Sequence, residues 1–326
     1  MMSGTDEDDD ISICFTPKTG LFAGDSRYLP SSLTGSVTIV IQFQTTAVLG
    51  FKTHGTTDLS TGYSFSDAGK KALAQAATYT VSNIHATCDT INMSSGLYEA
   101  TMMQQIAAGN DLQMVYKEYH TFRKSNIAST SAEHTFSLSS SSIDVLYSVF
   151  QAGNYNATGI PTRKYDGAEN TDAHTSNPFW FDSCCNNGSN SRATVKKGTS
   201  TYQYFVNNVP QTAYPASPLD AAADTVLLSN KVDQTSSGHL ITNLLDWNHG
   251  KAVFPCVLHM TENPMSVRSG YDARGSNSSC SVNFNNLLMP SENPAKGVVA
   301  NVSLVTIAEV SQVLHIKGGR QLLVEY

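Results

Sequence analysis

The chain has 326 residues and a net charge of −7, and charged residues make up only 14% of it, against about a quarter in ordinary globular proteins. That length is sufficient for two sizeable β-rich cores. The sequence contains no Lys/Arg cluster, so direct binding to nucleic acid, which needs cations to displace phosphate counterions, is not expected. The acidic run at residues 6–10 is expected to be a solvated, disordered terminus.

Neither secretion nor membrane insertion is indicated. The first residues are acidic and lack the apolar stretch of a signal peptide. The most apolar segment, residues 37–51, is interrupted by Gln42 and Gln44 and falls short of the roughly 20 residues that span a bilayer. We therefore expect a soluble protein, made in a reducing compartment, whose six cysteines stay free.

In the first half of the chain, alternating apolar residues predict strands. Val37, Ile39, Ile41 and Phe43 alternate with polar residues, which is typical of a strand with one wet face. Further strands are predicted at residues 78–91, 111–124 and 134–151, the last with a bend at 139–142. Between the first two lies a predicted helix at 94–110, capped by Ser94 or Ser95 and ended by a left-handed turn at Gly109 and Asn110. We expect this helix to close one end of a β-sandwich core.

The second half repeats this arrangement after a long polar stretch. Residues 154–200 are rich in Gly, Asn, Ser and Thr and are expected to form a connecting loop region that projects as an outer tower. A strand at 201–206 precedes a helix that begins at Ser217, with Pro218 and Asp220 in its first turn. Its predicted buried face consists of Leu219, Ala223, Val226 and Leu227. Strands are predicted at 253–260, 281–288, 298–307, 310–317 and 321–326.

The pattern as a whole predicts an all-β fold of two tandem β-sandwiches, each with one short helix. The predicted units are residues 1–153, with 1–10 disordered, the loop region 154–200, and residues 201–326. No repeat is visible at the level of residues, so the predicted duplication is one of architecture only.

Residue types that carry chemistry do not form a recognisable site. The chain has no G-x-S-x-G elbow and no phosphate-binding loop. The adjacent Cys184 and Cys185 do not have the spacing of zinc ligands, while Cys88 and Cys256 lie in strand-like runs where a thiol is expected to be a small buried hydrophobe.

The remaining titratable residues also have simpler interpretations. The main carboxylates in strand runs are expected on wet faces with nothing to pair them, and the strand histidines as hydrogen-bonded structural residues rather than bases. We therefore predict no enzyme, no cofactor, and no catalytic, cofactor-binding or metal-binding residue. The residues considered were Glu118, Asp144 and Glu309, together with His85, His120, His134, His249 and His259.

Five blocks of sequence, in this order, resemble a known family. The first comprises residues 11–22 with the Arg27 to Pro30 block and residues 35–41. It is followed by 79–89 with the helix and 119–122, by 134–150, by 202–206 with 214–215 and 218–220, and by the tail at 318–326. Together they resemble the double jelly-roll major capsid proteins of polinton-like viruses and related double-stranded DNA viruses.

The resemblance implies two tandem jelly rolls and a homotrimer of pseudo-hexagonal outline that tiles an icosahedral shell. The implied partners are neighbouring capsomers and minor capsid or penton proteins, with no direct nucleic acid and with contact to an internal membrane left open. The implied location is the virion capsid after synthesis in the cytoplasm or nucleus of a host cell. Because the Arg27 to Pro30 block stands so near the start of the chain, the first roll is expected to be shortened or to lack an N-terminal part.

Two other functions fit the residues. One is a carbohydrate- or receptor-binding β-sandwich surface protein, and the other is an enzyme built on jelly rolls, such as a polysaccharide-active one. Light scattering and retention on a glycan column separate a self-assembling protein from a binding module. A cleft with paired carboxylates or a set of metal ligands would mark the enzyme.

Overall fold

The fold is given by a computed structural model. It describes residues 29–43, 80–88, 90–92, 96–127, 129–152, 200–232, 252–259, 270–275, 278–287, 302–318 and 321–325, with residues 14, 20, 181–182 and 247. The predictions of a disordered stretch at 1–10 and of a tower loop at 154–200 fall on residues outside this set, apart from 181–182 and 200. Both stay predictions.

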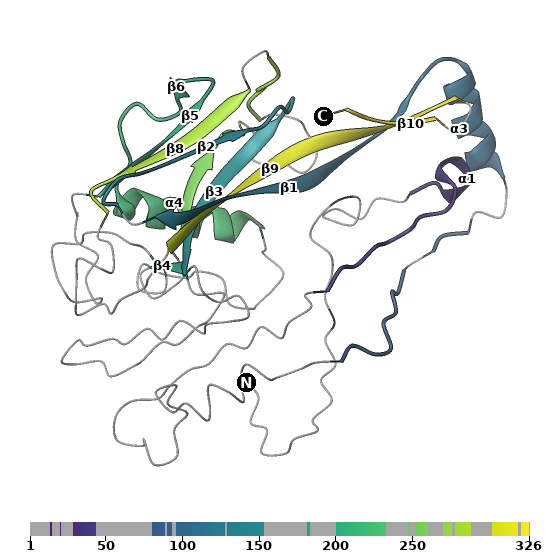
Figure 1. Cartoon of the computed structure of the whole chain (residues 1–326). Helices are drawn as coiled ribbons and strands as arrows, with labels where there is room; N and C mark the ends of the chain where they lie inside the picture. The colour runs from purple at the N-terminus through teal and green to yellow at the C-terminus, as the bar shows by residue number, and fades with distance from the viewer. Residues whose placement is uncertain are drawn as a thin grey trace.

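The described strands form two antiparallel sheets, and helices accompany them (Figure 1). The predicted all-β class is confirmed. The larger sheet contains β1 (Leu112–Ile127), β9 (Val302–Lys317), β3 (Ile143–Ala152), β4 (Phe181–Asp182), β7 (Phe254–Val257) and β10 (Gln321–Glu325), and the smaller contains β2 (Ala132–Ser137), β8 (Ser279–Asn285), β5 (Thr201–Val206) and β6 (Val209–Pro210). The helices are α1 (Ser31–Thr34), α3 (Leu97–Ala107) and α4 (Pro218–Val232).

The chain winds back and forth between the two sheets. The larger sheet has the order β1-β9-β3, with β4 and β7 on the far side of β3, and the smaller has the order β2-β8-β5-β6. This alternation is the winding of a jelly roll. The described strands do not follow the predicted division into residues 1–153 and 201–326, because each sheet pairs strands from both sides of 154–200. The prediction of two tandem rolls is not tested as a whole, since most of residues 1–111 lies outside the described residues.

Most predicted elements after Asn110 are confirmed within a few residues, with two exceptions. The strands predicted at 298–307 and 310–317 form one continuous strand, β9, because the residues between them keep their pairing with β1 without a turn. Helix α4 buries Ala221, Ala222, Thr225 and Leu228, whereas Leu219 of the predicted face is 43% exposed. Its start at Ser217 is confirmed, since the Ser217 hydroxyl and amide donate to the Asp220 carboxylate.

Predictions in the first third were less accurate. Residues 36–43 and 80–88, expected as strands, run without regular secondary structure. Helix α3 is confirmed, but its N-cap is Gly96 in the left-handed conformation and not Ser94 or Ser95. Gly109 does adopt the expected left-handed φ of 89°. Nor does α3 close the sandwich core, since its partly buried residues Met102 and Ile106 pack on a separate cluster.

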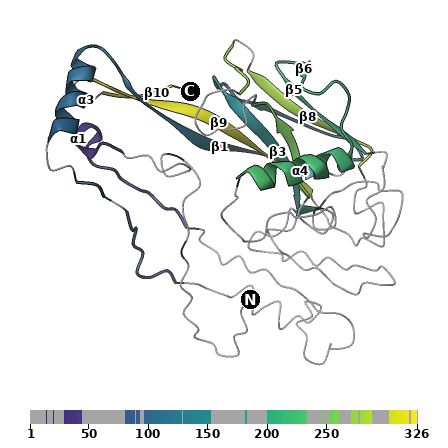
Figure 2. The same cartoon turned by 180° about the vertical axis from the view of Figure 1, so that it is seen from behind.

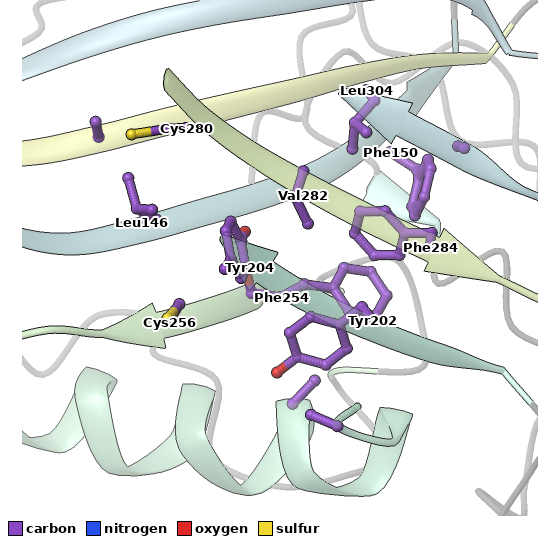
Figure 3. Close-up of a cluster of buried hydrophobic side chains, with 14 of the residues drawn as sticks. Leu146, Phe150, Tyr202, Tyr204, Phe254, Cys256, Cys280, Val282, Phe284 and Leu304 are labelled. Atoms are coloured by element: carbon purple, nitrogen blue, oxygen red, sulfur yellow. The ribbon is translucent and has the colours of Figure 1, made fainter. Parts of the chain in front are cut away.

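The core between the sheets is rich in aromatic side chains. Phe254 lies at its centre, with ring centroids 5.1 Å from Phe284, 5.3 Å from Tyr202, 5.5 Å from Trp247 and 5.8 Å from Phe150. Figure 3 shows the labelled rings converging from strands of both sheets, with α4 running beneath them. The part of the molecule where the two sheets face each other, together with α4, is called the body below.

One end of the larger sheet extends beyond the body. β3 pairs with β9 only as far as Val310, so the remainder of β9 pairs with β1 on one side and β10 on the other. Helices α1 and α3 lie at the far end of this extension (Figures 1 and 2), where Leu33, Met114, Leu314 and Ile316 form a second, small cluster. This extension, with its helices, is called the arm. Among the described residues, no helix has the length and apolar character needed to cross a membrane.

Candidate functional site

Exposed apolar side chains gather on the arm and on the two extended segments that leave it. Of 18 large hydrophobic side chains exposed among the described residues, 13 lie at positions 37–103 or 322–323. The body contains more than half of the described strands but only the other five of these exposed side chains. An apolar surface gathered in one region of a soluble protein usually marks an interaction site.

The two segments, residues 36–43 and 80–92, contribute most of this surface. Val40 is 86% exposed, and Val37, Ile39, Ile41 and Phe43 are each about half exposed. Ile84 and Ile91 are 59% and 56% exposed. Neither segment forms a backbone–backbone hydrogen bond with another described residue outside its own run, and both leave the arm tip away from the sheets (Figures 1 and 2). They therefore combine apolar side chains with backbone groups that no other described segment pairs.

Charge does not hinder contact between two such surfaces. Residues 36–43 contain no charged side chain, and residues 80–92 contain only Asp89. Helix α3 adds exposed Leu97, Tyr98 and Met103, with Glu99 as its single charged residue. A second copy of the chain could therefore approach this surface without significant like-charge repulsion.

A second feature is a buried ionic cluster on the opposite face of the larger sheet from the aromatic core. Lys117 of β1, Asp144 of β3 and Glu309 of β9 are 2%, 0% and 8% exposed. A β-bulge lies between Ile143 and Val145, and such a bulge re-aims a side chain. It leaves Asp144 as the extra residue of β3, and the Asp144 carboxylate lies against Lys117 across β9.

The contacts within this cluster are dense. Lys117 Nζ donates to Asp144 Oδ2 and to Ser311 Oγ at 2.8 Å, and lies 3.6 Å from Glu309 Oε1. The Ser311 hydroxyl donates to Asp144 Oδ2 at 2.6 Å, and the Ser142 hydroxyl donates to Oδ1 at 3.0 Å. Two carboxylates thus share one ammonium group, and hydroxyl groups donate further hydrogen bonds to the carboxylate oxygens.

Tyrosine hydroxyls complete the surroundings of Glu309. Tyr147 donates to Glu309 Oε2 at 3.2 Å, and Tyr119 also bonds to this carboxylate. Burial, and next the negative charge of Glu309, raises the pKa of both tyrosines well above the usual range. Both therefore stay protonated donors at neutral pH.

The backbone around Asp144 is held on both sides. Its carbonyl oxygen accepts the amides of Leu258 at 2.8 Å and His259 at 3.1 Å. Gly270 packs directly against the carboxylate, and a Cβ there would collide with Asp144 Oδ1 and the Ile143 carbonyl oxygen. The Gly270 amide donates to the Ser142 hydroxyl at 3.0 Å. The carboxylate is therefore fixed in position.

The prediction that Asp144 and Glu309 lie unpaired on wet faces was wrong. The alternation along the strands was predicted correctly. The face of β9 that was expected to be exposed to water is buried around Ser311, however, so Glu309 lies at a buried position. The missed signal was local: Asp144 stands between Ile143 and Val145, and Glu309 between Ala308 and Val310. A single charge inside an apolar strand run needs a partner, and Lys117 at the centre of β1 is that partner.

The histidines and cysteines that the structure describes are divided between buried and exposed positions. His134 is buried and its Nδ1 lies 3.0 Å from the Thr306 hydroxyl, so its predicted hydrogen bonding is confirmed. His120 is partly exposed beside Glu118, and His85 is exposed. Cys256 is buried as expected, and burial raises its pKa to about 12, so it is an inert thiol. Cys88 is exposed, contrary to the prediction. Cys184, Cys185 and His249 lie outside the described residues. Within the described residues, no group of three potential metal ligands occurs.

Comparisons with known proteins found likenesses only among solved structures, of which three are described here. No protein-family model matches the chain, and no curated protein matches it. The PBCV-1 virus capsid, in a quasi-atomic model, is 10% identical with a TM-score of 0.40, covering 67% of this chain and 52% of that one. PBCV-1 VP54, in a crystal structure fitted into a reconstruction of the virophage Sputnik, is 11% identical with a TM-score of 0.40, covering 69% and 54%.

The third likeness is weaker. A chain of the Sputnik virophage cryo-EM structure is 11% identical with a TM-score of 0.32, covering 66% of this chain and 39% of that one. The chain thus spans about half or less of the length of these structures. Because all three TM-scores are below 0.5, we draw no functional conclusion from them.

Proposed function

We propose that the chain is a structural protein of a viral shell that associates with copies of itself through the arm and the segments 36–43 and 80–92. The observation that carries the proposal is the concentration of uncharged, exposed apolar side chains on this one region. The resemblance of the sequence blocks to polinton-like capsid proteins supports the same function. In its finer form the proposal is a homotrimer that tiles an icosahedral shell.

The composition is consistent with this function. A shell protein covers much of its surface with other copies, which favours polar and apolar residues over charged ones, and only 14% of this chain is charged. Closed sandwiches protect their strand edges, while an arm outside the body is free to reach a neighbour. Self-association through a repeated surface then builds a closed assembly from modest contacts.

The test is size-exclusion chromatography with light scattering on the purified chain and on the double variant Ile39→Lys and Ile41→Lys. The wild type should form trimers or larger species. Both isoleucines are about half exposed, so their further burial contributes on the order of 2 kcal/mol per chain. The double variant should therefore associate at least tenfold more weakly.

The matched control is Val209→Lys in β6. Val209 is 53% exposed, close to the 49% of Ile39, but it belongs to the body. It should assemble like the wild type. Equal weakening by both variants would assign the effect to general solubility. A wild-type chain that stays monomeric at all concentrations and is retained on a glycan column would replace the proposal with a carbohydrate-binding surface protein.

A further inference from the structure

The ionic cluster at the junction of body and arm has the components of a condensation reaction. An amine, Lys117 Nζ, lies against a carboxyl oxygen of Asp144, and a second carboxyl group, Glu309, lies 3.6 Å from the amine. All three side chains are nearly inaccessible to water. We propose that Lys117 and Asp144 become joined by an amide bond within the folded chain, with Glu309 as the group that moves protons.

The reaction balances without an oxidant or any other reactant. A proton first passes from the Lys117 ammonium group to the Asp144 carboxylate, which leaves a neutral amine and a neutral acid. The amine nitrogen then attacks Asp144 Cγ, and the new N–C bond replaces the bond from Cγ to one carboxyl oxygen. Glu309 accepts a proton from the attacking nitrogen and returns it to the departing oxygen, so that one water molecule leaves and Glu309 is unchanged.

Position and burial favour this step over hydrolysis. Groups held in contact by a protein can reach effective concentrations of roughly 10⁵–10⁸ M. Asp144 is held through its carbonyl oxygen, through the hydroxyls of Ser142 and Ser311, and by the close approach of Gly270. Low exposure limits the water that would reverse the reaction.

The electrostatics of the cluster favour the same outcome. In the ionised form two buried carboxylates share one buried ammonium, an arrangement that is costly to desolvate. The amide removes one positive and one negative charge together. The remaining carboxylate, Glu309, keeps the hydroxyls of Tyr119 and Tyr147 as donors. The product thus holds one buried charge in place of three.

The bond would lie where mechanical load passes from the arm to the body. Lys117 belongs to β1 and Asp144 to β3, and these two strands flank β9. On the side of the arm, β3 extends no farther than Ile143, whereas β1 and β9 continue into the arm. An amide between them would join β1 and β3 covalently across β9 at that junction. Force on the arm could then not peel β1 from the sheet without breaking a covalent bond.

Mass spectrometry of the intact, fully denatured chain tests the proposal, independently of assembly. The wild type should be lighter than its sequence by one water molecule, and a protease digest should contain a branched peptide joining residues 117 and 144. A wild-type mass equal to that of the sequence, unchanged on prolonged incubation of the folded protein, would overturn the proposal.

Variants assign the roles. Lys117→Arg and Glu309→Gln should each show the full mass of its own sequence, whereas Asp144→Asn should lose one ammonia and give the same branched peptide as the wild type. Glu118→Gln, a half-exposed carboxylate on β1 outside the cluster, is the matched control and should still lose water. Loss of water in Glu309→Gln at the wild-type rate would remove Glu309 from the mechanism. Circular dichroism establishes that each variant is folded.

Discussion

The body and the arm treat apolar side chains in opposite ways. In the body, residues such as Phe150, Leu146 and Leu304 from one sheet meet Val282 and Phe284 from the other, and all are 2% exposed or less. In the arm only five apolar side chains are buried among the described residues, and the surrounding segments leave theirs in solvent. The same strands, β1 and β9, pass through both regions.

This difference indicates where stability and association reside. The body encloses its own apolar surface and is expected to fold as an isolated chain. The arm is held by backbone pairing with little apolar cover, so additional burial must come from outside it. Mutations that test stability therefore belong in the body, and mutations that test association belong in the arm.

The largest effect is expected for Phe254→Ala. This ring is 1% exposed and packs against Phe150, Tyr202, Trp247 and Phe284, so its loss should lower the free energy of unfolding by about 3–5 kcal/mol. Urea denaturation at a concentration where the chain is monomeric measures this. Met102→Ala, which removes a partly buried arm side chain, should cost less than half as much. Equal costs would mean that the arm and body share one core.

A smaller effect is expected for Gly270→Ala. The new Cβ would collide with the Ile143 carbonyl oxygen and the Asp144 carboxylate, and relief requires β3 to shift, at about 1–3 kcal/mol. Gly275→Ala is the matched control, because nothing lies within 4 Å of a Cβ at Gly275. It should change the free energy of unfolding by no more than about 0.5 kcal/mol. Similar denaturation curves for the two variants would contradict the close packing over Asp144.

Local signals were sufficient to predict most of the body. The alternation of β5, the polar bend before Ile143 and the capping box at Ser217 are each determined by residues close in sequence, and each is confirmed. The pairing of β1 with β9 joins residues almost 200 positions apart. No local pattern encodes such a partner, which is why the predicted division at 154–200 does not match the described strands.

The same limit applies to the ionic cluster and to the misassigned segments: local sequence marks the isolated carboxylates, but it does not identify their partner. Lys117, Asp144 and Glu309 come from three strands, and only the sheet order together with a one-residue bulge brings them into contact. Residues 36–43 alternate like a strand but have no partner strand among the described residues. Periodicity indicates which face of a segment is apolar, and it does not indicate what that face contacts.

The smallest effect is expected from acid, acting through His134 in the body. Burial, and next the charge of Lys124, lowers the pKa of His134 below its usual value of 6.5. The unfolded chain therefore binds this proton more readily than the folded one. The contribution of His134 is fully present above about pH 6.5, and it is lost as the pH falls from there toward the lowered pKa of the folded state.

Urea midpoints between pH 7.5 and pH 5 for the wild type and for His134→Gln measure this contribution. The wild-type midpoint should fall more steeply with acid than that of the variant, because glutamine can bond to Thr306 without accepting a proton. His85→Gln, which removes an exposed histidine on the segment 80–88, should keep the wild-type profile. If His134→Gln also kept it, the buried imidazole would not be the group that couples the stability of the body to pH.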